Sequence, residues 1–280
     1  MEASSPWVFA GDWKREGLFW FPASKSSFGA DGLTSQTSDP KASASVIVAA
    51  SRIAILYGRS PSGGKFKVSI DNKTPITINS RASTNSSGIH WINTNWAFHN
   101  LKIYNITGGD VRLAGIIASR QQTTLNEVEI DQLGHGGDRA ESNLAPAQIG
   151  ALVDLAPKLT IIMFGTNEEG SEMLGGGSSY RAKLTNGIAA RGRAARRTGK
   201  CIVVPHAIND RDQALQAIYY SAARTGAKNG GCAFVDIFAG MWDKSSVSAG
   251  LTSDSIHPTT EGYARMSMRL AQLIKSTLPK

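Results

Sequence analysis

The strongest constraint on the fold is a change of residue pattern near the middle of the chain. Up to about Ser119 the sequence is rich in Ser, Thr, Asn and Gly, and its apolar residues form short alternating runs. From Glu127 onward, apolar runs alternate with segments of helical spacing. The first pattern is typical of a β-sandwich, and the second of a parallel sheet covered by helices. We therefore predict an all-β sandwich over residues 1–122 and an α/β domain over residues 123–280.

Turn residues divide the N-terminal part into predicted strands. Gly, Asn and Asp tolerate the backbone angles of tight turns, and they stand at 62–64, 71–73 and 108–110. The strands predicted around these turns are 45–49, 52–57, 65–70, 76–79, 90–92, 99–104 and 111–119.

The C-terminal part is predicted to alternate strands with helices. The apolar run 159–164 indicates a buried parallel strand, and the Ala- and Arg-rich segment 179–198 indicates a helix. The remaining predicted elements are strands at 128–130, 201–205 and 233–237 and helices at 212–225 and 259–277.

Composition and charge exclude several classes of protein. The chain of 280 residues is 41% hydrophobic, which is enough for a packed core, and no run is long enough to span a membrane. The N-terminus lacks the pattern of a secretory signal, so export by the general route is not expected. Two cysteines, Cys201 and Cys232, cannot make a disulfide framework, and we expect buried free thiols.

The net charge of +8 raises the question of a polyanionic partner. The densest basic cluster has the spacing of a solvated helix face and no interleaved aromatic residues for base stacking, so nucleic acid is not expected. A polyanion-binding module remains a third hypothesis, and it predicts steep salt dependence. The cluster consists of Arg191, Arg193, Arg196, Arg197 and Lys200.

Two stretches of the N-terminal part resemble the galactose-binding-like jelly rolls of carbohydrate-binding modules. The sequence GGKFKVSID at 63–71 matches a hairpin of these modules, and HNLKI at 99–103 matches their closing strand. The resemblance implies a jelly-roll sandwich that binds glycan. Tryptophans of such a sandwich belong to its core in most cases, although aromatic faces also stack on sugar rings. The tryptophans concerned are Trp7, Trp13, Trp20, Trp91 and Trp96.

Three short motifs follow predicted strands of the C-terminal part. The first is GHGGD at 134–138, the second is GTNE at 165–168, and the third is DSIHP at 254–258. Because open parallel sheets place their sites at the carboxyl ends of strands, these loops should meet in one crevice. In this order and context the motifs resemble the glycine, asparagine and Asp-His blocks of the SGNH hydrolases, a family of serine esterases. The resemblance implies a flavodoxin-like three-layer α/β domain.

The same resemblance implies acyl transfer to water and gives four residues a role. His257 would be the general base, because imidazole takes and returns a proton near neutral pH, and Asp254 would orient its ring. The amide hydrogen of Gly137 and the side-chain amide of Asn167 would stabilise the tetrahedral oxyanion. No cofactor is implied, and no Cys/His cluster has the spacing of zinc ligands. The roles of His135, His206 and Asp210, which lie near predicted strand ends, stay open.

The nucleophile of such an enzyme is missing from its expected place. Family members carry it in a Gly-Asp-Ser turn, and the nearest sequence here is VFAGDW at 8–13, with Trp13 where serine would stand. Either residues 7–10 supply the strand and Trp13 replaces the nucleophile, or a separate chain or domain supplies both. A third alternative assigns residues 7–20 to the sandwich. Ser142 is a poor substitute because it follows the glycine motif, on the wrong loop.

Together these features predict a carbohydrate-directed esterase that removes O-acyl groups, in particular acetyl, from a polysaccharide or other glycan. In one of the alternatives above the nucleophile comes from outside the chain, through a homo-oligomer or a second polypeptide, and whether the chain is active alone stays open. The alternative is a catalytically inactive glycan-binding or structural component, for example of a phage tail or fibre. The resemblance suggests an extracellular or virion-surface location.

Overall fold

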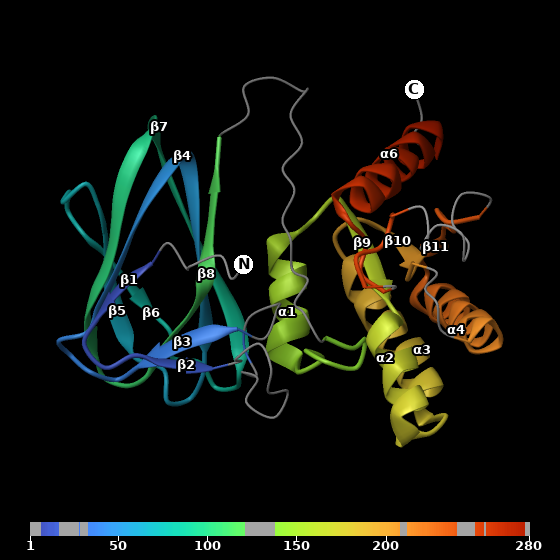
Figure 1. The fold of residues 1–280 in the computed structure, drawn as a ribbon. Coiled ribbons are helices and arrows are strands. Elements are labelled where there is room, and N and C mark those ends of the chain that lie inside the picture. Colours follow the sequence, from blue (N-terminus) through green and yellow to red (C-terminus); the bar gives the residue numbers. More distant parts are fainter. Residues whose placement is uncertain are drawn as a thin grey trace. The chain divides into compact units, whose positions relative to one another are not determined.

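The chain forms two compact units. The computed structural model describes residues 7–16, 28, 33–120, 138–207, 212–239, 250–254 and 256–277. One unit comprises Met1–Gly137 and Ala145–Leu155, and the other comprises Asp138–Leu144 and Ala156–Lys280 (Figure 1). Among the described residues, no helix has the length and apolar character needed to cross a membrane.

The first unit is built on an antiparallel sheet of eight strands. The order within the sheet is β2-β3-β8-β4-β7-β5-β6, and β1 pairs with β4. The strands are β1 (Val8–Ala10), β2 (Lys14–Glu16), β3 (Thr34–Thr37), β4 (Ser43–Arg59), β5 (Lys65–Ile70), β6 (Ile76–Asn79), β7 (Ser86–Thr107) and β8 (Val111–Ser119).

Alternating residues of these strands form one apolar core. Val46, Phe66 and Leu101 are buried in it, and they come from β4, β5 and β7. A register shift between Ala50 and Arg52 bends the β4–β7 ladder without ending it. For this reason the predicted strands 45–49 and 52–57 are one continuous strand, as are 90–92 and 99–104.

The predicted turns are confirmed by the backbone. Asp71 and Asn72 have φ angles of 51° and 58°, and Lys73 N donates to Ile70 O at 2.9 Å. Gly108 and Gly109 also have positive φ and connect β7 to β8. These residue types permit such angles at low cost, which is why the sequence indicates the hairpins so clearly.

One helix that the sequence analysis did not predict belongs to the first unit. Helix α1 (Pro146–Leu155) packs against β7, and Ser87 Oγ on that strand donates a hydrogen bond to Asp154 Oδ2. Gly150 allows the close approach, because a Cβ there would lie 3.3 Å from Ser87 Oγ.

The second unit contains a parallel three-stranded sheet among the described residues. Its strands β9 (Leu159–Phe164), β10 (Lys200–Pro205) and β11 (Ala233–Phe234) have the order β11-β10-β9. The register pairs Phe164 with Pro205, so that the carboxyl ends of β9 and β10 lie side by side. The other elements are α2 (Thr166–Ser171), the π-helical turn η2 (Glu172–Gly176), α3 (Ser179–Ala195), α4 (Gln213–Gly230) and α6 (Thr260–Thr277).

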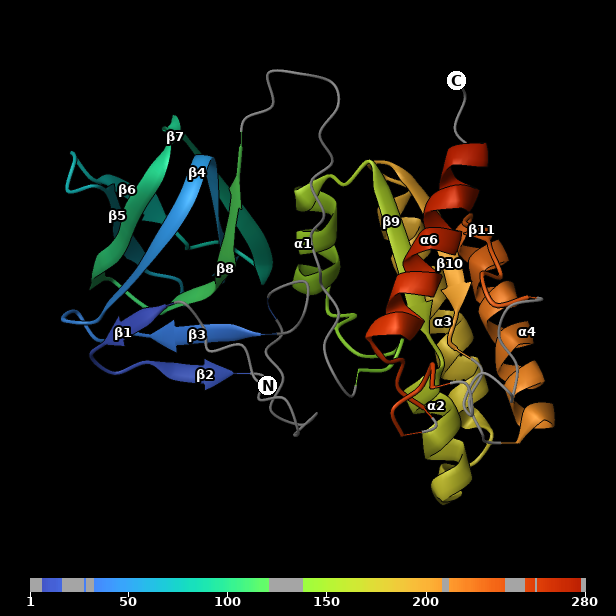
Figure 2. The ribbon, with the colours of Figure 1, turned by 45° about the horizontal axis from the view of Figure 1, so that its top comes forward.

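Helices cover both faces of this sheet, as Figure 2 shows. On one face, Ile162 and Val203 pack with Leu184 of α3 and Tyr219 of α4. On the other face, Val204 packs with residues of α6 that include Met266. The described residues therefore form three layers, α3 and α4, the sheet, and α6, as expected for a flavodoxin-like domain.

Strand β9 departs from its prediction in one respect. It is parallel, as expected, and Ile162 is buried, but Ile161 and Met163 are 43% and 39% exposed. It is also the last strand of the order among the described residues. The prediction that both faces of this strand are buried is wrong in this structure.

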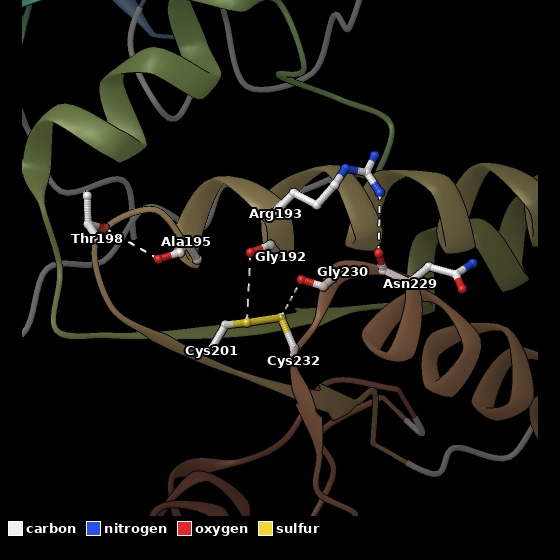
Figure 3. Close-up of a disulfide and its surroundings, with 8 residues drawn as sticks. All are labelled: Gly192, Arg193, Ala195, Thr198, Cys201, Asn229, Gly230 and Cys232. Carbon is white, nitrogen blue, oxygen red and sulfur yellow. Dashed lines mark hydrogen bonds between the residues drawn. A yellow bond between two sulfur atoms is a disulfide. The ribbon is translucent and has the colours of Figure 1, made fainter.

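The two cysteines form a disulfide, so the expectation of free thiols is wrong. Cys201 lies at the start of β10, and Cys232 directly precedes β11 (Figure 3). The parallel register pairs Ile202 with Ala233, which places the two cysteines side by side with their Cα atoms 4.9 Å apart. The pairing follows from strand register. The two cysteines are 31 positions apart in the sequence, and this spacing alone does not indicate a disulfide.

Candidate active site

The Asp-His motif forms a compact loop before α6. Backbone hydrogen bonds close this loop, from Ser253 N to His257 O and from Thr259 N to Leu251 O, both at 2.9 Å. Leu251 is buried in the cluster that contains Val204 and Ala207, at the carboxyl end of β10. The loop is thereby anchored at the rim where β9 and β10 end.

Asp254 and His257 face each other on this loop. His257 Nδ1 lies 2.6 Å from Asp254 Oδ2, while Asp254 Oδ1 accepts hydrogen bonds from the backbone N–H groups of Ile256 and His257. The hydrogen bonds from His257, first from its backbone and then from its ring, lower the pKa of Asp254 to about 2. Asp254 is therefore a carboxylate at any working pH.

This arrangement fixes the role of each imidazole nitrogen. A carboxylate can only accept hydrogen bonds, so the neutral ring of His257 carries its proton on Nδ1. Nε2 is then the proton acceptor, which is the form a general base needs. The imidazole is 70% exposed, so the hydroxyl of a nucleophile can reach it.

The asparagine motif lies at the carboxyl end of β9. Asn167 is in the first turn of α2, and its Nδ2 donates to the backbone carbonyl of Asp138 at 2.7 Å. Asp138 is the last residue of the glycine motif. The structure therefore joins the asparagine motif to the end of the glycine motif, and one N–H of the Asn167 amide remains for a further acceptor.

Two ionisable side chains form hydrogen bonds with the backbone of the segment that follows Asp138. The backbone N–H of Ala140 donates to Glu168 Oε1, and the guanidinium of Arg191 donates to Ala140 O and Ser142 O. Glu168 is buried, and burial raises its pKa. Burial also lowers the pKa of Arg191, to about 10.

Arg191 corrects the expectation of a uniform solvated helix face. Arg193, Arg196, Arg197 and Lys200 are exposed, as predicted. Arg191 instead shares the inward face of α3 with Ile188 and Leu184, three and seven positions before it, both of which are buried. Its position in the helical repeat puts it on that face, where backbone carbonyls satisfy its donors.

A buried His-Glu pair lies at the same rim. His206 directly follows β10, and its Nε2 lies 2.9 Å from Glu169 Oε2. The ring also contacts Gly165, where an added Cβ would lie 2.4 Å from His206 Nδ1. His206, whose role was left open, therefore packs beneath the asparagine motif and links β10 to α2.

Several predicted residues lie outside the described part of the chain. These are Gly137, His135, Asp210, Trp20 and the predicted strand 128–130. Ser142 is described, and its hydroxyl accepts a hydrogen bond from Arg139 N at 3.2 Å. Among the described residues, no group of three or more His, Cys, Asp or Glu is placed to hold a metal ion.

The structure excludes one of the three alternatives for the missing serine block. Strand β1 pairs antiparallel with β4, with Phe9 opposite Ala44, so residues 8–10 do not fill the parallel sheet. Trp13 packs against the core of the first unit, and its Nε1 donates to Ala10 O and Ser43 O, both at 3.1 Å. Trp13 therefore does not occupy the position of the nucleophile, and the described residues of 7–20 belong to the β unit.

Sequence reasoning missed the functional environment formed by Glu168, Glu169 and Arg191. A signal was present for the two glutamates, because two adjacent acidic residues follow an apolar strand at the start of a helix. The helical repeat that places Arg191 beside Leu184 and Ile188 was a second signal. Neither pattern reveals which backbone groups these side chains would meet.

Comparison with known proteins agrees with the motif assignment. The model of the GDSL-like lipase/acylhydrolase family matches residues 102–265, more than half of the chain. No curated protein matches the sequence.

Solved structures that are similar to this chain include two carbohydrate esterases of family two. The one from Cellvibrio japonicus is 15% identical, with 96% of this chain and 97% of that chain covered and a TM-score of 0.34. The one from Clostridium thermocellum, in complex with cellohexaose, is 11% identical, with coverages of 95% and 98% and a TM-score of 0.32.

An acetylxylan esterase from Geobacillus stearothermophilus, solved as a catalytic mutant, is 16% identical. The match covers 49% of this chain and 68% of that chain, with a TM-score of 0.41. The extent of the family match, together with an Asp-His loop and an asparagine motif at the ends of parallel strands, shows that this chain belongs to the GDSL-like lipase/acylhydrolase family.

Proposed function

We propose that the chain is the Asp-His and oxyanion part of a carbohydrate esterase that removes O-acetyl groups from a glycan. The observation that carries this proposal is the Asp254–His257 pair, whose geometry leaves His257 Nε2 exposed as a proton acceptor. The Asn167 amide, held against Asp138 at the end of β9, supplies a donor for the oxyanion. Gly137, immediately before Asp138, is the proposed second donor.

The reaction would proceed by two acyl transfers. His257 takes the proton of a nucleophilic hydroxyl as its oxygen attacks the ester carbonyl, and the amide donors stabilise the oxyanion that forms. When this intermediate collapses, the sugar oxygen leaves and receives the proton from His257. Water, activated by the same imidazole, then releases the acyl group as carboxylate.

We propose that the hydroxyl is supplied from outside this chain, by a second copy or another polypeptide. The sequence contains no Gly-Asp-Ser, and the VFAGDW segment belongs to the β unit. Strand β9 is the last strand of its sheet among the described residues, and it exposes Ile161 and Met163. An additional parallel strand that paired with β9 would extend the sheet and bring its own carboxyl end to the same rim.

The test combines turnover of a chromogenic acetyl ester with a fluorophosphonate probe that labels activated serine. Turnover should require His257, so His257→Ala should abolish it, while exchanging the half-buried His90 of the other unit for Ala should not. Mass spectrometry then identifies the labelled polypeptide, which we expect to be a different chain or another copy. Equal turnover in wild type and His257→Ala would refute the catalytic proposal, and a label on this chain's own serine in a monomer would refute the external hydroxyl.

We further propose that the first unit is a jelly roll that binds the glycan on the outer face of β7. Trp96 and Phe98, two residues apart on that strand, are 53% and 79% exposed, and Ile47 of β4 is 68% exposed. Arg120 lies over the Trp96 ring at 5.4 Å. Trp7 and Trp13 pack against the core, and the Trp91 ring is covered by Arg52 at 3.8 Å. Trp96 is thus the one described tryptophan that we assign to sugar stacking.

Affinity electrophoresis in gels that contain acetylated xylan or mannan tests this surface. The double change Trp96→Ala and Phe98→Ala should weaken binding about 30-fold, since each stacked ring contributes on the order of 1 kcal/mol. Val8→Ala, at an equally exposed apolar residue of β1, is the control. Retardation unchanged by the double change would refute the surface, and binding without any ester turnover would favour the non-catalytic alternative.

A further inference from the structure

The backbone of Ala140 is held from two directions by buried charged groups. Glu168 of α2 accepts its N–H, and Arg191 of α3 donates to its carbonyl and to that of Ser142. Helix α3 touches the same residue at Gly187, where a Cβ would lie 2.0 Å from Ala140 O. Ala140 is itself fully buried, so this short segment is fixed between two helices.

Holding the segment in this way has a large desolvation cost. A buried carboxylate and a largely desolvated guanidinium both lose hydration, and polar groups in such places are tolerated only with specific partners. Here Arg191 donates to the carbonyls of Ala140 and Ser142, and Glu168 accepts from Ala140 N as well as from backbone N–H groups of its own turn. Arg191 also lies over the Phe164 ring at 4.7 Å, and this contact connects Arg191 to the end of β9.

The held segment is what orients the asparagine amide. Asp138 lies two residues before Ala140, and its carbonyl accepts from Asn167 Nδ2 at 2.7 Å. A carbonyl accepts only from the N–H side of an amide, so this contact decides which way the Asn167 amide faces. Asn143 Nδ2 donates to Asp138 Oδ2 at 3.0 Å, which also restrains the Asp138 side chain.

We propose that Arg191 and Glu168 are positioning residues that set the orientation of the Asn167 amide through the segment 138–142. The inference rests on the proposed function, because the orientation matters for chemistry only if Asn167 is an oxyanion donor. It assigns to two buried charges a role in aligning the site, although neither touches the substrate. Loss of one oriented donor in such a site costs on the order of 100-fold in turnover.

The experiment measures the amide of Asn167 directly by NMR, with the resonances assigned through their loss in Asn167→Asp. In the wild type we expect two well-separated amide protons, one of them shifted by the bond to Asp138 O and slow to exchange. Arg191→Met should bring the two resonances together and raise the exchange rate at least tenfold. Arg193→Met, on the exposed side of the same helix, is the matched control and should change nothing.

Two conservative variants separate positioning from folding. Glu168→Gln keeps an oxygen for Ala140 N and should retain the wild-type resonances, whereas Glu168→Leu should reproduce the effect of Arg191→Met. If Arg191→Met does not fold, Arg191→Lys takes its place in the test. Lysine keeps the charge but not the paired donors, so the Asn167 amide resonances should move closer together without merging. With the nucleophile present, kcat should fall about 100-fold in Arg191→Met and KM much less.

Unchanged Asn167 resonances in a folded Arg191→Met or Arg191→Lys protein would overturn the inference. The outcome differs from failure of the proposed function, in which His257→Ala leaves ester turnover unchanged while the Asn167 resonances still depend on Arg191. Both readouts are made on the full chain.

Discussion

At the scale of single residues, Asp254 shows how strongly local hydrogen bonds can set a charge. Its carboxylate accepts two backbone N–H bonds and faces the imidazole of His257, and its pKa falls to about 2. Because the group is exposed, these bonds and not burial determine its state. The sequence motif indicated the pair, and the structure adds the two backbone bonds that hold it.

Replacing Asp254 by Asn should expose this dependence. An amide can present an N–H towards Nδ1, which favours the tautomer with the proton on Nε2 and removes the general base. We expect ester turnover to fall by roughly 10²- to 10⁴-fold, and the ¹⁵N resonances of the imidazole to report the tautomer change even without turnover. Glu261→Gln, at an exposed carboxylate paired with Arg265 on α6, is the control and should leave both readouts unchanged.

A second residue pair makes the stability of the β unit depend on pH. The buried His99 has Nδ1 2.7 Å from Asp71 Oδ2 and Nε2 2.9 Å from Asn95 O, so both nitrogens face acceptors. The Asn95 carbonyl and then Asp71 raise the pKa of His99. Protonated His99 is therefore favoured in the folded state, and its contribution is complete below the pKa of the unfolded chain and lost as pH rises through the raised value.

His99→Gln should accordingly lower the melting temperature more at pH 5.5 than at pH 9. A decrease of roughly 2 to 6 °C at the lower pH corresponds to one charge-assisted hydrogen bond in a unit of this size. His90→Gln, on the same strand but not buried, is the control. An equal decrease at both pH values would show that His99 is neutral when folded.

At the scale of secondary-structure elements, the sequence predicted correctly those elements whose ends are marked by turn residues. Strands β5, β6, β8 and β9 begin and end at the predicted residues, because turn residues flank them. Helix α4 runs beyond its predicted end to Gly230, where Gly231 takes a left-handed φ of 71°. The bulge in β4, the helix α1 and the three-dimensional neighbours of β1 depend on contacts between distant segments, and no local pattern specifies them.

The start of α2 gives a prediction at this scale. Gly165 has a φ of 136°, and a Cβ there would collide with the His206 ring. Gly165→Ala should therefore displace α2, with a decrease in the free energy of unfolding of roughly 2 to 4 kcal/mol and a shift of the Asn167 amide resonances. Gly175→Ala, at a φ of 91° with nothing within 4 Å, carries comparable backbone strain and isolates the effect of the collision.

At the scale of the whole molecule, the two residue patterns of the sequence correspond to units of different architecture. The contacts assign Ala145–Leu155 to the first unit although it follows Asp138–Leu144 of the second, so the chain passes between the units more than once. A single boundary drawn in the sequence does not express such an exchange. The residues of the candidate site show the same limit, since motifs indicated Asn167 and His257 as candidates but not the charged side chains that hold residues 140–142.

Removing the disulfide should weaken the second unit selectively. The bond closes a loop with a sequence separation of 31, for which the chain-entropy estimate is about 3 to 4 kcal/mol. The double change Cys201→Ser and Cys232→Ser should lower the free energy of unfolding by about that amount, measured by urea denaturation with helical circular dichroism as the probe. The β unit, followed by the fluorescence of its tryptophans in a Trp242→Phe background, should keep its midpoint, and a common shift of both probes would contradict independent units.

The position of the disulfide determines where the strands of the parallel sheet can separate. Cys201 and Cys232 tie the first residues of β10 to those of β11, while Asn167, His206 and the Asp254 loop stand where the strands finish. Because the bond restrains the strands at one end, fluctuations that separate them are concentrated at the other end, where the candidate site lies. Reduction would remove this restraint, spread the same motion along the full length of the strands and change how far the candidate site fluctuates.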